Sequence, residues 1–316
     1  MYLDVGDGHQ IYYKEYGSPT GKPVVVLHGG PGGSCSSSKK VLRYFNLKRW
    51  RVIMFDQRGC GLSKPFLSLH KNTTWDLVAD IEKLRCACSI DRWTVFGGSW
   101  GTTLALAYAS KHMDRIAAFV LRGVCLLEPW ETDWLYKEGG ASRLFPEAWT
   151  KFTSKFTSKF TSKFTSGSKS KSQSKVKGNL TRAYSRLLRN RKTRKSAAAA
   201  WWSWEAAISS LESHTDKTGS KTRLSLAILE NHYFLHNAWL KPGELIAAAK
   251  RIPASVPVII VQGRYDIVCP AASAVAVANA VKHAELHMTI AGHAGADPEN
   301  AKALKTALVK LTSETD

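Results

Sequence analysis

Short, continuous apolar runs alternate along this chain with longer segments in which apolar residues recur at helical spacing. The apolar runs, which are typical of strands buried on both faces of a parallel sheet, are residues 24–27, 93–96, 117–121, 256–261 and 286–290. Helices are predicted at 74–87, 102–109 and 271–281. This alternation predicts an α/β fold.

The alternation stops between residues 128 and 244, which we interpret as an inserted, mainly helical cap. The core then consists of residues 1–127 and 245–316. The chain has 316 residues and an apolar content of 44%, so the roughly 200 residues outside the cap can bury a large core. A site at the junction would be assembled from both flanks of the insertion.

Glycines surround a serine between the predicted strand at 93–96 and the helix at 102–109. The segment Gly-Gly-Ser-Trp-Gly, residues 97–101, is a G-x-S-x-G sequence. In a strand–turn–helix context this sequence makes a turn so sharp that the serine hydroxyl projects at the carboxyl end of the strand. The alternative is a glycine-rich loop without a chemical role. We predict that Ser99 is a nucleophile.

Two further loops follow predicted strands and carry the partners that a nucleophilic serine needs. Asp266 comes just after the strand at 256–261, and His293 lies between small residues after the strand at 286–290. The order serine, aspartate, histidine is that of α/β-hydrolases. We therefore predict that His293 is the general base and that Asp266 orients it.

A glycine-rich loop follows the first buried strand. Its sequence, His-Gly-Gly-Pro-Gly-Gly at 28–33, is neither a P-loop nor a G-x-G-x-x-G sequence. Backbone N–H groups without side chains can bind the oxyanion of a tetrahedral intermediate. We assign that oxyanion hole to the N–H groups of Gly30 and Trp100.

Six segments together resemble the prolyl aminopeptidases, also called proline iminopeptidases, of the α/β-hydrolase fold. They are the glycine loop at 28–33, Asp-Gln-Arg-Gly-Cys-Gly-Leu-Ser at 56–63, Asn-Thr-Thr-Trp-Asp-Leu-Val-Ala-Asp at 72–80, Gly-Gly-Ser-Trp-Gly-Thr at 97–102, Ser-Arg-Leu-Phe-Pro at 142–146 and Glu-Asn-His-Tyr-Phe at 230–234. The likeness covers nearly the whole chain. It implies a mostly parallel eight-stranded sheet with an inserted helical cap.

The resemblance also implies an exopeptidase that removes N-terminal proline, with selectivity residing in the cap. Glu205 and Glu230 match the two carboxylates that hold the free amino terminus in this family, and Arg122 matches an arginine near them. Such a pairing is physically reasonable because a secondary ammonium offers two N–H donors and one positive charge. The residues that would form the proline pocket are Phe234, Leu127, Leu135 and Cys125.

The sequence departs from this family in three respects: the pocket wall, residue 60 and one long segment. Cys125 stands where an aromatic residue is expected, and Leu135 where one is often found, so the pocket wall is smaller and the preference for proline looser. Cys60 replaces a serine. The third departure is the segment 151–195, in which Lys-Phe-Thr-Ser occurs four times in succession and which has no acidic residue.

This segment contributes much of the formal net charge of +20. A basic run with spaced phenylalanines can contact nucleic acid or an anionic surface. We favour a solvated repeat expansion, because its apolar content is low and a four-residue period drifts by about 40° per repeat on a helix. Residues 182–195 are a candidate basic helix.

The remaining features suggest a cytoplasmic enzyme without a metal or organic cofactor. The six cysteines show no metal-ligand spacing beyond one Cys-x-Cys, and no signal peptide or long apolar segment is found. Two other functions stay open: a broad esterase or amidase, and a binding protein that acts through the basic segment. Ser99 argues against haloalkane dehalogenases and epoxide hydrolases of this fold, since these have an aspartate at that position.

Overall fold

The computed structural model describes residues 1–35, 39–161, 178–211 and 218–313. Eight strands form one sheet in the order β1-β2-β4-β3-β5-β6-β7-β8. They are β1 (Tyr2–Gly6), β2 (His9–Gly17), β3 (Lys22–Leu27), β4 (Trp50–Phe55), β5 (Trp93–Gly98), β6 (Ile116–Arg122), β7 (Val258–Gly263) and β8 (Glu285–Thr289). The pairs β1–β2 and β2–β4 are antiparallel, and all other pairs are parallel. The predicted α/β-hydrolase sheet is confirmed.

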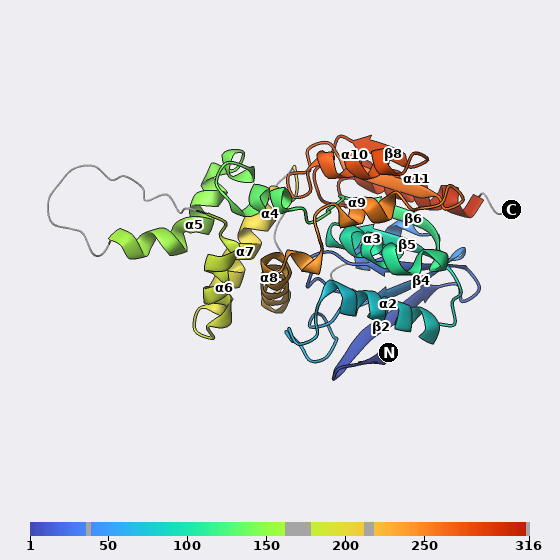
Figure 1. Ribbon diagram of the computed structural model, residues 1–316, viewed down its shortest axis with the longest axis horizontal. Coiled ribbons are helices and arrows are strands. Elements are labelled where there is room, and N and C mark those ends of the chain that lie inside the picture. Colours follow the sequence, from blue (N-terminus) through green and yellow to red (C-terminus); the bar gives the residue numbers. More distant parts are fainter. Residues whose placement is uncertain (36–38, 162–177, 212–217, 314–316) are drawn as a thin grey trace.

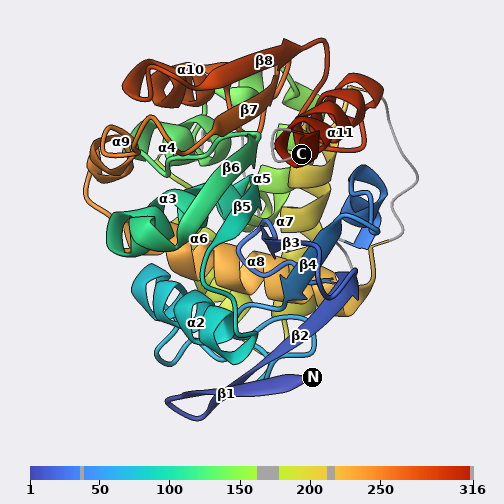
Figure 2. The same ribbon diagram turned by 90° about the vertical axis from the view of Figure 1, so that its right-hand side faces the viewer.

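Helices cover both faces of the sheet, as Figure 2 shows. One face carries α2 (Thr74–Ala87), α3 (Trp100–His112), α9 (Glu244–Ala249) and α10 (Ala271–Ala280), and the other carries α11 (Pro298–Ser313) with the 3₁₀ turn η1 (Lys39–Tyr44). Each face has its own apolar core. Three shorter 3₁₀ turns are η2 (Met113–Arg115), η3 (Ala141–Arg143) and η4 (Asn237–Trp239).

Among the described residues between β6 and β7, five helices stand beyond one end of the sheet (Figure 1). They are α4 (Pro129–Tyr136), α5 (Pro146–Thr161), α6 (Thr181–Arg189), α7 (Arg194–Ile208) and α8 (Ser220–Leu235). Their facing side chains form a third apolar cluster, rich in aromatic rings. We refer to these helices as the cap.

Local sequence explains several element boundaries. Helix α2 begins at Thr74, as predicted, because Thr73 caps it and shares a capping box with Asp76. Strand β7 begins two residues later than predicted, at Val258, because Pro257 offers no N–H and Val256 N donates to the turn at Pro253.

Two of the motif segments noted above meet in the core. Arg58 donates from Nε and Nη2 to the two carboxylate oxygens of Asp80, at 2.6 and 2.8 Å. Both side chains are buried, and bidentate pairing of this kind fixes orientation as well as charge. The segments 56–63 and 72–80 therefore support the sheet end on which the site is built.

The first Lys-Phe-Thr-Ser repeat packs into the cap through its phenylalanine, although Lys151 and Ser154 are exposed. Our interpretation of the repeats as too poor in apolar residues to pack was therefore wrong at this point. Helix α5 runs through them, and the Phe152 ring is buried and stacks on Tyr184 with centroids 4.5 Å apart. Phe156 contacts the same tyrosine edge-on at 5.1 Å. A drift of about 40° per repeat leaves two successive phenylalanines on one helix face. The repeats at 162–166 lie outside the described residues.

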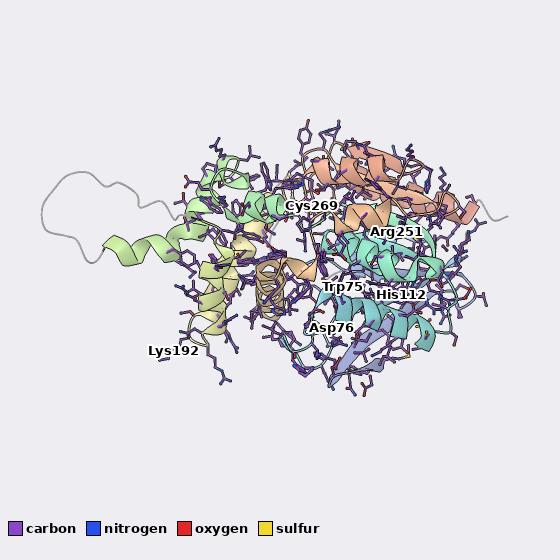
Figure 3. All side chains as sticks on the ribbon, in the orientation of Figure 1. Trp75, Asp76, His112, Lys192, Arg251 and Cys269 are labelled. Atoms are coloured by element: carbon purple, nitrogen blue, oxygen red, sulfur yellow. The ribbon has the colours of Figure 1, made fainter. Side chains whose placement is uncertain are left out.

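The candidate basic helix at 182–195 is interrupted. Helix α6 ends at Arg189, and α7 starts only at Arg194. Side-chain bonds from Asn190 and Thr193 hold the intervening turn: Asn190 Oδ1 accepts from Lys192 N, and Thr193 Oγ1 donates to Leu187 O. Figure 3 places Lys192 at the outer edge of the cap, far from the sheet.

Candidate active site

Ser99 occupies the tight turn between β5 and α3. Its φ and ψ are 59° and −127°, a strained conformation for a residue with a side chain. A Cβ on Gly97 would lie 2.4 Å from Gly101 O, and one on Gly101 would lie 2.1 Å from Leu27 O. The glycines thus permit a turn that aims the serine away from the sheet, as the sequence predicts.

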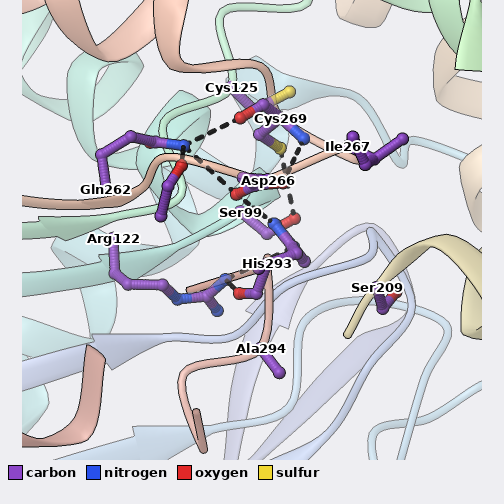
Figure 4. Close-up of polar contacts among 12 residues, drawn as sticks. Ser99, Arg122, Cys125, Ser209, Gln262, Asp266, Ile267, Cys269, His293 and Ala294 are labelled. Atoms are coloured by element: carbon purple, nitrogen blue, oxygen red, sulfur yellow. Dashed lines mark hydrogen bonds and ion pairs between the residues drawn. The ribbon is translucent and has the colours of Figure 1, made fainter. Parts of the chain in front are cut away.

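His293 and Asp266 meet at the carboxyl ends of β8 and β7 (Figure 4). His293 Nδ1 donates to Asp266 Oδ2 at 2.8 Å, and the other carboxylate oxygen accepts from Cys269 N at 2.7 Å. Asp266 is only 4% exposed. A Cβ on Gly123 would come within 3.1 Å of the imidazole, so a glycine is needed there. This pairing fixes the histidine tautomer that leaves Nε2 free to accept a proton.

Arg122 contacts His293 directly. The family resemblance had instead implied that Arg122 lies beside the two cap glutamates. Its Nη1 donates to the backbone oxygen of His293 at 2.7 Å and lies 3.3 Å from Nε2. Ser99 Oγ instead contacts Cys269 Sγ at 3.9 Å. Between these described side chains no Ser99–His293 hydrogen bond is formed, which is common in sites without substrate.

A cavity of about 240 Å³ opens above Ser99, between the sheet and the cap. It contacts both predicted oxyanion-hole residues, Gly30 and Trp100, and His293. A Cβ on Gly29 would lie 3.3 Å from the Cβ of Ser99, so the glycine loop passes directly beside the serine. The predicted reacting groups therefore share one cavity.

Glu205 of α7 and Glu230 of α8 reach the same cavity and form what we call the glutamate pair. Trp201 Nε1 donates to both carboxylates, at 3.0 Å to Glu205 Oε1 and 2.6 Å to Glu230 Oε2. The hydroxyl of Tyr136 also donates to Glu205. One indole therefore holds two carboxyl groups side by side.

Burial dominates the electrostatics of the glutamate pair. Loss of solvation raises the pKa of Glu205, and loss of solvation together with the charge of Glu205 raises the pKa of Glu230 further. Two carboxylates so close cannot both ionise easily. The raised pKa values favour a pair that keeps one proton between its two carboxyl groups, and a single ammonium group could take the place of that proton.

The four predicted pocket residues line this cavity: Phe234, Leu127, Leu135 and Cys125. Sequence reasoning missed several others, which are Thr132, Tyr136, Val268 and Cys269. Thr132 and Tyr136 come from a segment that carried no separate motif. Val268 and Cys269 could have been found from their positions, since they lie two and three residues after Asp266 in the same loop.

Within the described ranges, no group of three or more histidine, cysteine or carboxylate side chains is arranged to hold a metal ion. Helices long and apolar enough to cross a bilayer are likewise missing from the described part of the chain.

Comparison with known proteins gives a consistent assignment. Residues 22–298 match the family described as alpha/beta hydrolase fold. The chain is 44% identical to a proline iminopeptidase of Xylella fastidiosa over 310 residues, covering 96% of this chain and 93% of the relative. It is 42% identical to the proline iminopeptidase of Neisseria meningitidis (97% and 94% covered) and 39% identical to that of Arabidopsis thaliana (98% and 78% covered).

Solved structures support the fold alone. An aryl esterase from Burkholderia cenocepacia superposes with a TM-score of 0.69 at 17% identity, covering 99% of both chains. An esterase from Exiguobacterium antarcticum gives 0.65 at 19% identity, covering 99% of this chain and 98% of the esterase. The sequence relatives carry the finer assignment: this chain belongs to the proline iminopeptidase family of α/β-hydrolases.

Proposed function

We propose that this protein is a serine exopeptidase that releases N-terminal proline from peptides. The single observation that carries the proposal is the glutamate pair, which faces the same cavity as Ser99 and His293. A serine hydrolase of esters has no need of a buried negative charge beside its acyl pocket. A peptidase that selects a free amino terminus does.

The proposed binding mode follows from charge and hydrogen bonding. The secondary ammonium of an N-terminal proline donates two hydrogen bonds, one to each carboxyl group of the pair. Its positive charge replaces the proton that the pair holds when empty. Phe234 and Leu135 then contact the proline ring, and the carbonyl carbon comes to rest at Ser99.

The proposed reaction is acyl transfer. Ser99 Oγ attacks the prolyl carbonyl while His293 Nε2 takes its proton, and Asp266 stabilises the imidazolium that forms. The N–H groups of Gly30 and Trp100 bind the oxyanion, at about 3–4 kcal/mol for each donor. His293 then protonates the leaving amine, and water repeats the sequence on the prolyl ester.

One rearrangement is required before attack. His293 Nε2 must exchange its contact with Arg122 for one with Ser99 Oγ, which in turn leaves Cys269 Sγ. All four side chains line the same cavity.

We further propose the division into a core of residues 1–127 and 245–316 and a cap of residues 128–244, and a cytoplasmic location. The latter is supported by six free thiols, which are typical of a reducing compartment. A nucleic-acid contact through 151–195 receives no support here, and residues 162–177 of that segment lie outside the described residues.

The test compares a prolyl arylamide with its N-acetylated form, using the wild type and Ser99→Ala, Glu230→Gln and Glu147→Gln variants. Glu147 is an exposed glutamate of the cap and serves as the matched control. We expect cleavage of the free substrate alone, lost in Ser99→Ala, weakened through KM in Glu230→Gln and unchanged in Glu147→Gln. Equal cleavage of both substrates would instead identify a broad esterase or amidase.

A further inference from the structure

Two cysteine side chains face each other in the wall of the cavity. Cys125, after β6, and Cys269, after β7, both line the cavity above Ser99. Their side chains interact, and the Cys125 thiol raises the pKa of the Cys269 thiol. Figure 4 shows both residues close to Ser99. We call them the dithiol. The proposed reaction requires only space at this position and makes no use of two thiols.

The backbones that carry the dithiol are fixed. The backbone of Cys125 is held on both sides. Its N–H donates to Thr102 Oγ1 at 2.9 Å, and its carbonyl accepts from Thr103 Oγ1 at 2.7 Å. Cys269 N donates to Asp266, and its carbonyl accepts from Gln262 Nε2 at 2.9 Å. A chelating atom would therefore find two sulfur ligands already in place, at little cost in conformational entropy.

The other four cysteines do not offer such a site. The charge of Cys60 contributes to the raised pKa of the Cys35 thiol, so these two side chains are near each other. Both are buried, however, and neither lines the cavity. Cys86 is exposed and Cys88 is buried at the end of α2. Among the six cysteines, only those of the dithiol are both close to a second thiol and accessible from the cavity.

We propose that the dithiol is a binding site for trivalent organoarsenicals, which close the cavity over Ser99. An arsenoxide, R–As=O, condenses with the two thiols: two As–S bonds form, the As–O bond is broken, and the oxygen leaves as water with both thiol protons. The arsenic stays trivalent, so no oxidant or reductant is needed. Its organic group is accommodated by the apolar wall of the cavity, which includes Leu127 and Phe234.

The geometry favours a bridging atom over a direct disulfide. A disulfide requires the two sulfurs to approach to about 2.0 Å with a narrow range of dihedral angles, whereas Cys125 and Cys269 are free thiols whose sulfurs are not bonded to each other. A bridging arsenic accepts that wider spacing. Soft sulfur ligands suit a soft metalloid, and two of them, without a third protein ligand, match an arsenic atom that keeps one organic group.

The test is intact-protein mass spectrometry of the reduced, folded enzyme after one equivalent of phenylarsine oxide and a wash with excess glutathione. A single As–S bond exchanges with a monothiol, whereas a chelate resists it. We expect one phenylarsenic adduct on the wild type, removed by 2,3-dimercaptopropanol, and the same on Cys86→Ser. The Cys125→Ser and Cys269→Ser variants should lose the adduct in the wash.

A second readout locates the site. The arsenical should abolish labelling of Ser99 by a fluorophosphonate in the wild type and in Cys86→Ser. In Cys125→Ser, labelling after treatment should equal that of the same variant untreated. Labelling of the untreated variants also reports that they are folded. An adduct that survives in either dithiol variant, or no adduct on the wild type, would overturn the proposal. Neither readout depends on the peptide substrate, so failure here would leave the proposed peptidase activity standing.

Discussion

Arg122 holds His293 from the side opposite Asp266. Its Nη1 donates to the His293 backbone oxygen at 2.7 Å and touches Nε2 at 3.3 Å. A Cβ on Gly98 would lie 2.6 Å from Arg122 Nη2, so the guanidinium is packed against the serine turn. Arg122 thus connects the strand that carries the nucleophile with the loop that carries the base. We propose that Arg122 positions His293 for catalysis.

The Arg122→Met variant should lower kcat by about 10²-fold, because a small misplacement of a catalytic group costs about that much. Methionine keeps much of the apolar stem and removes every donor. KM for a prolyl arylamide should change little, since the glutamate pair is untouched. Steady-state kinetics would check this. An equal rise in KM would show that Arg122 acts on substrate binding, as the family resemblance implied.

Replacing Asp266 by Asn should lower kcat by about 10⁴-fold, because the amide favours the wrong imidazole tautomer while the fold is retained. Asp266 Oδ1 also accepts from Cys269 N, and the asparagine oxygen can keep that bond. Kinetics combined with near-UV circular dichroism would separate chemistry from folding. Activity within tenfold of the wild type would remove Asp266 from the proposed mechanism.

That Ser99 and His293 share a cavity at the carboxyl ends of the strands could be predicted from the sequence, because each follows a strand in a glycine-marked turn. The position of Arg122 could not be predicted, since its partner lies in a loop 171 residues away and only the folded sheet brings them together. The contact of Cys269 with Ser99 spans 170 residues and was missed for the same reason.

Parts of the fold escaped prediction for a different reason. Strands β1 and β2 lie at the antiparallel edge of the sheet and are only half-buried, so they lack the continuous apolar runs that mark central strands. The burial of Phe152 depends on Tyr184 of another helix. Repeat composition alone carries no information about such a partner.

The contribution of the glutamate pair to the free energy of unfolding should fall as pH rises. Burial raises the folded-state pKa of both carboxyl groups above their ordinary value of 4.5. Above that value the folded state binds more protons than the unfolded chain, so the free energy of unfolding decreases with pH until the raised pKa is passed. Urea unfolding at acid and at neutral pH should show a smaller decrease for Glu230→Gln than for the wild type. The Glu147→Gln control should follow the wild type; identical slopes in all three would contradict a shared buried proton.

The identity of residue 125 should set how strictly proline is selected. Cys125 lines the cavity beside Leu127 and Leu135, and a larger side chain would narrow it. We expect Cys125→Phe to keep kcat/KM for a prolyl arylamide and to lower it for leucyl and phenylalanyl arylamides by about 10–200-fold, the range typical of small changes in apolar pockets. Cys86→Ser, at an exposed site, should leave the profile unchanged. A uniform loss on all substrates would indicate a damaged cavity and would argue against a selective wall.

The first two repeat phenylalanines offer a matched pair for testing how the cap is held. Phe152 is 1% exposed and stacks on both Tyr184 and Trp204, whereas Phe156 touches Tyr184 only at its edge and is half-buried. Phe152→Ala should lower the free energy of unfolding by about 3–5 kcal/mol, as expected for a fully buried ring, and Phe156→Ala by clearly less.

The loss of the Phe152 ring should also raise KM for the free prolyl substrate. The ring centroid lies 6.0 Å from that of Trp201, whose indole holds the glutamate pair. Chemical unfolding and steady-state kinetics on the two variants would check both effects, and equal destabilisation by the two changes would show that the repeats pack less selectively than the structure indicates.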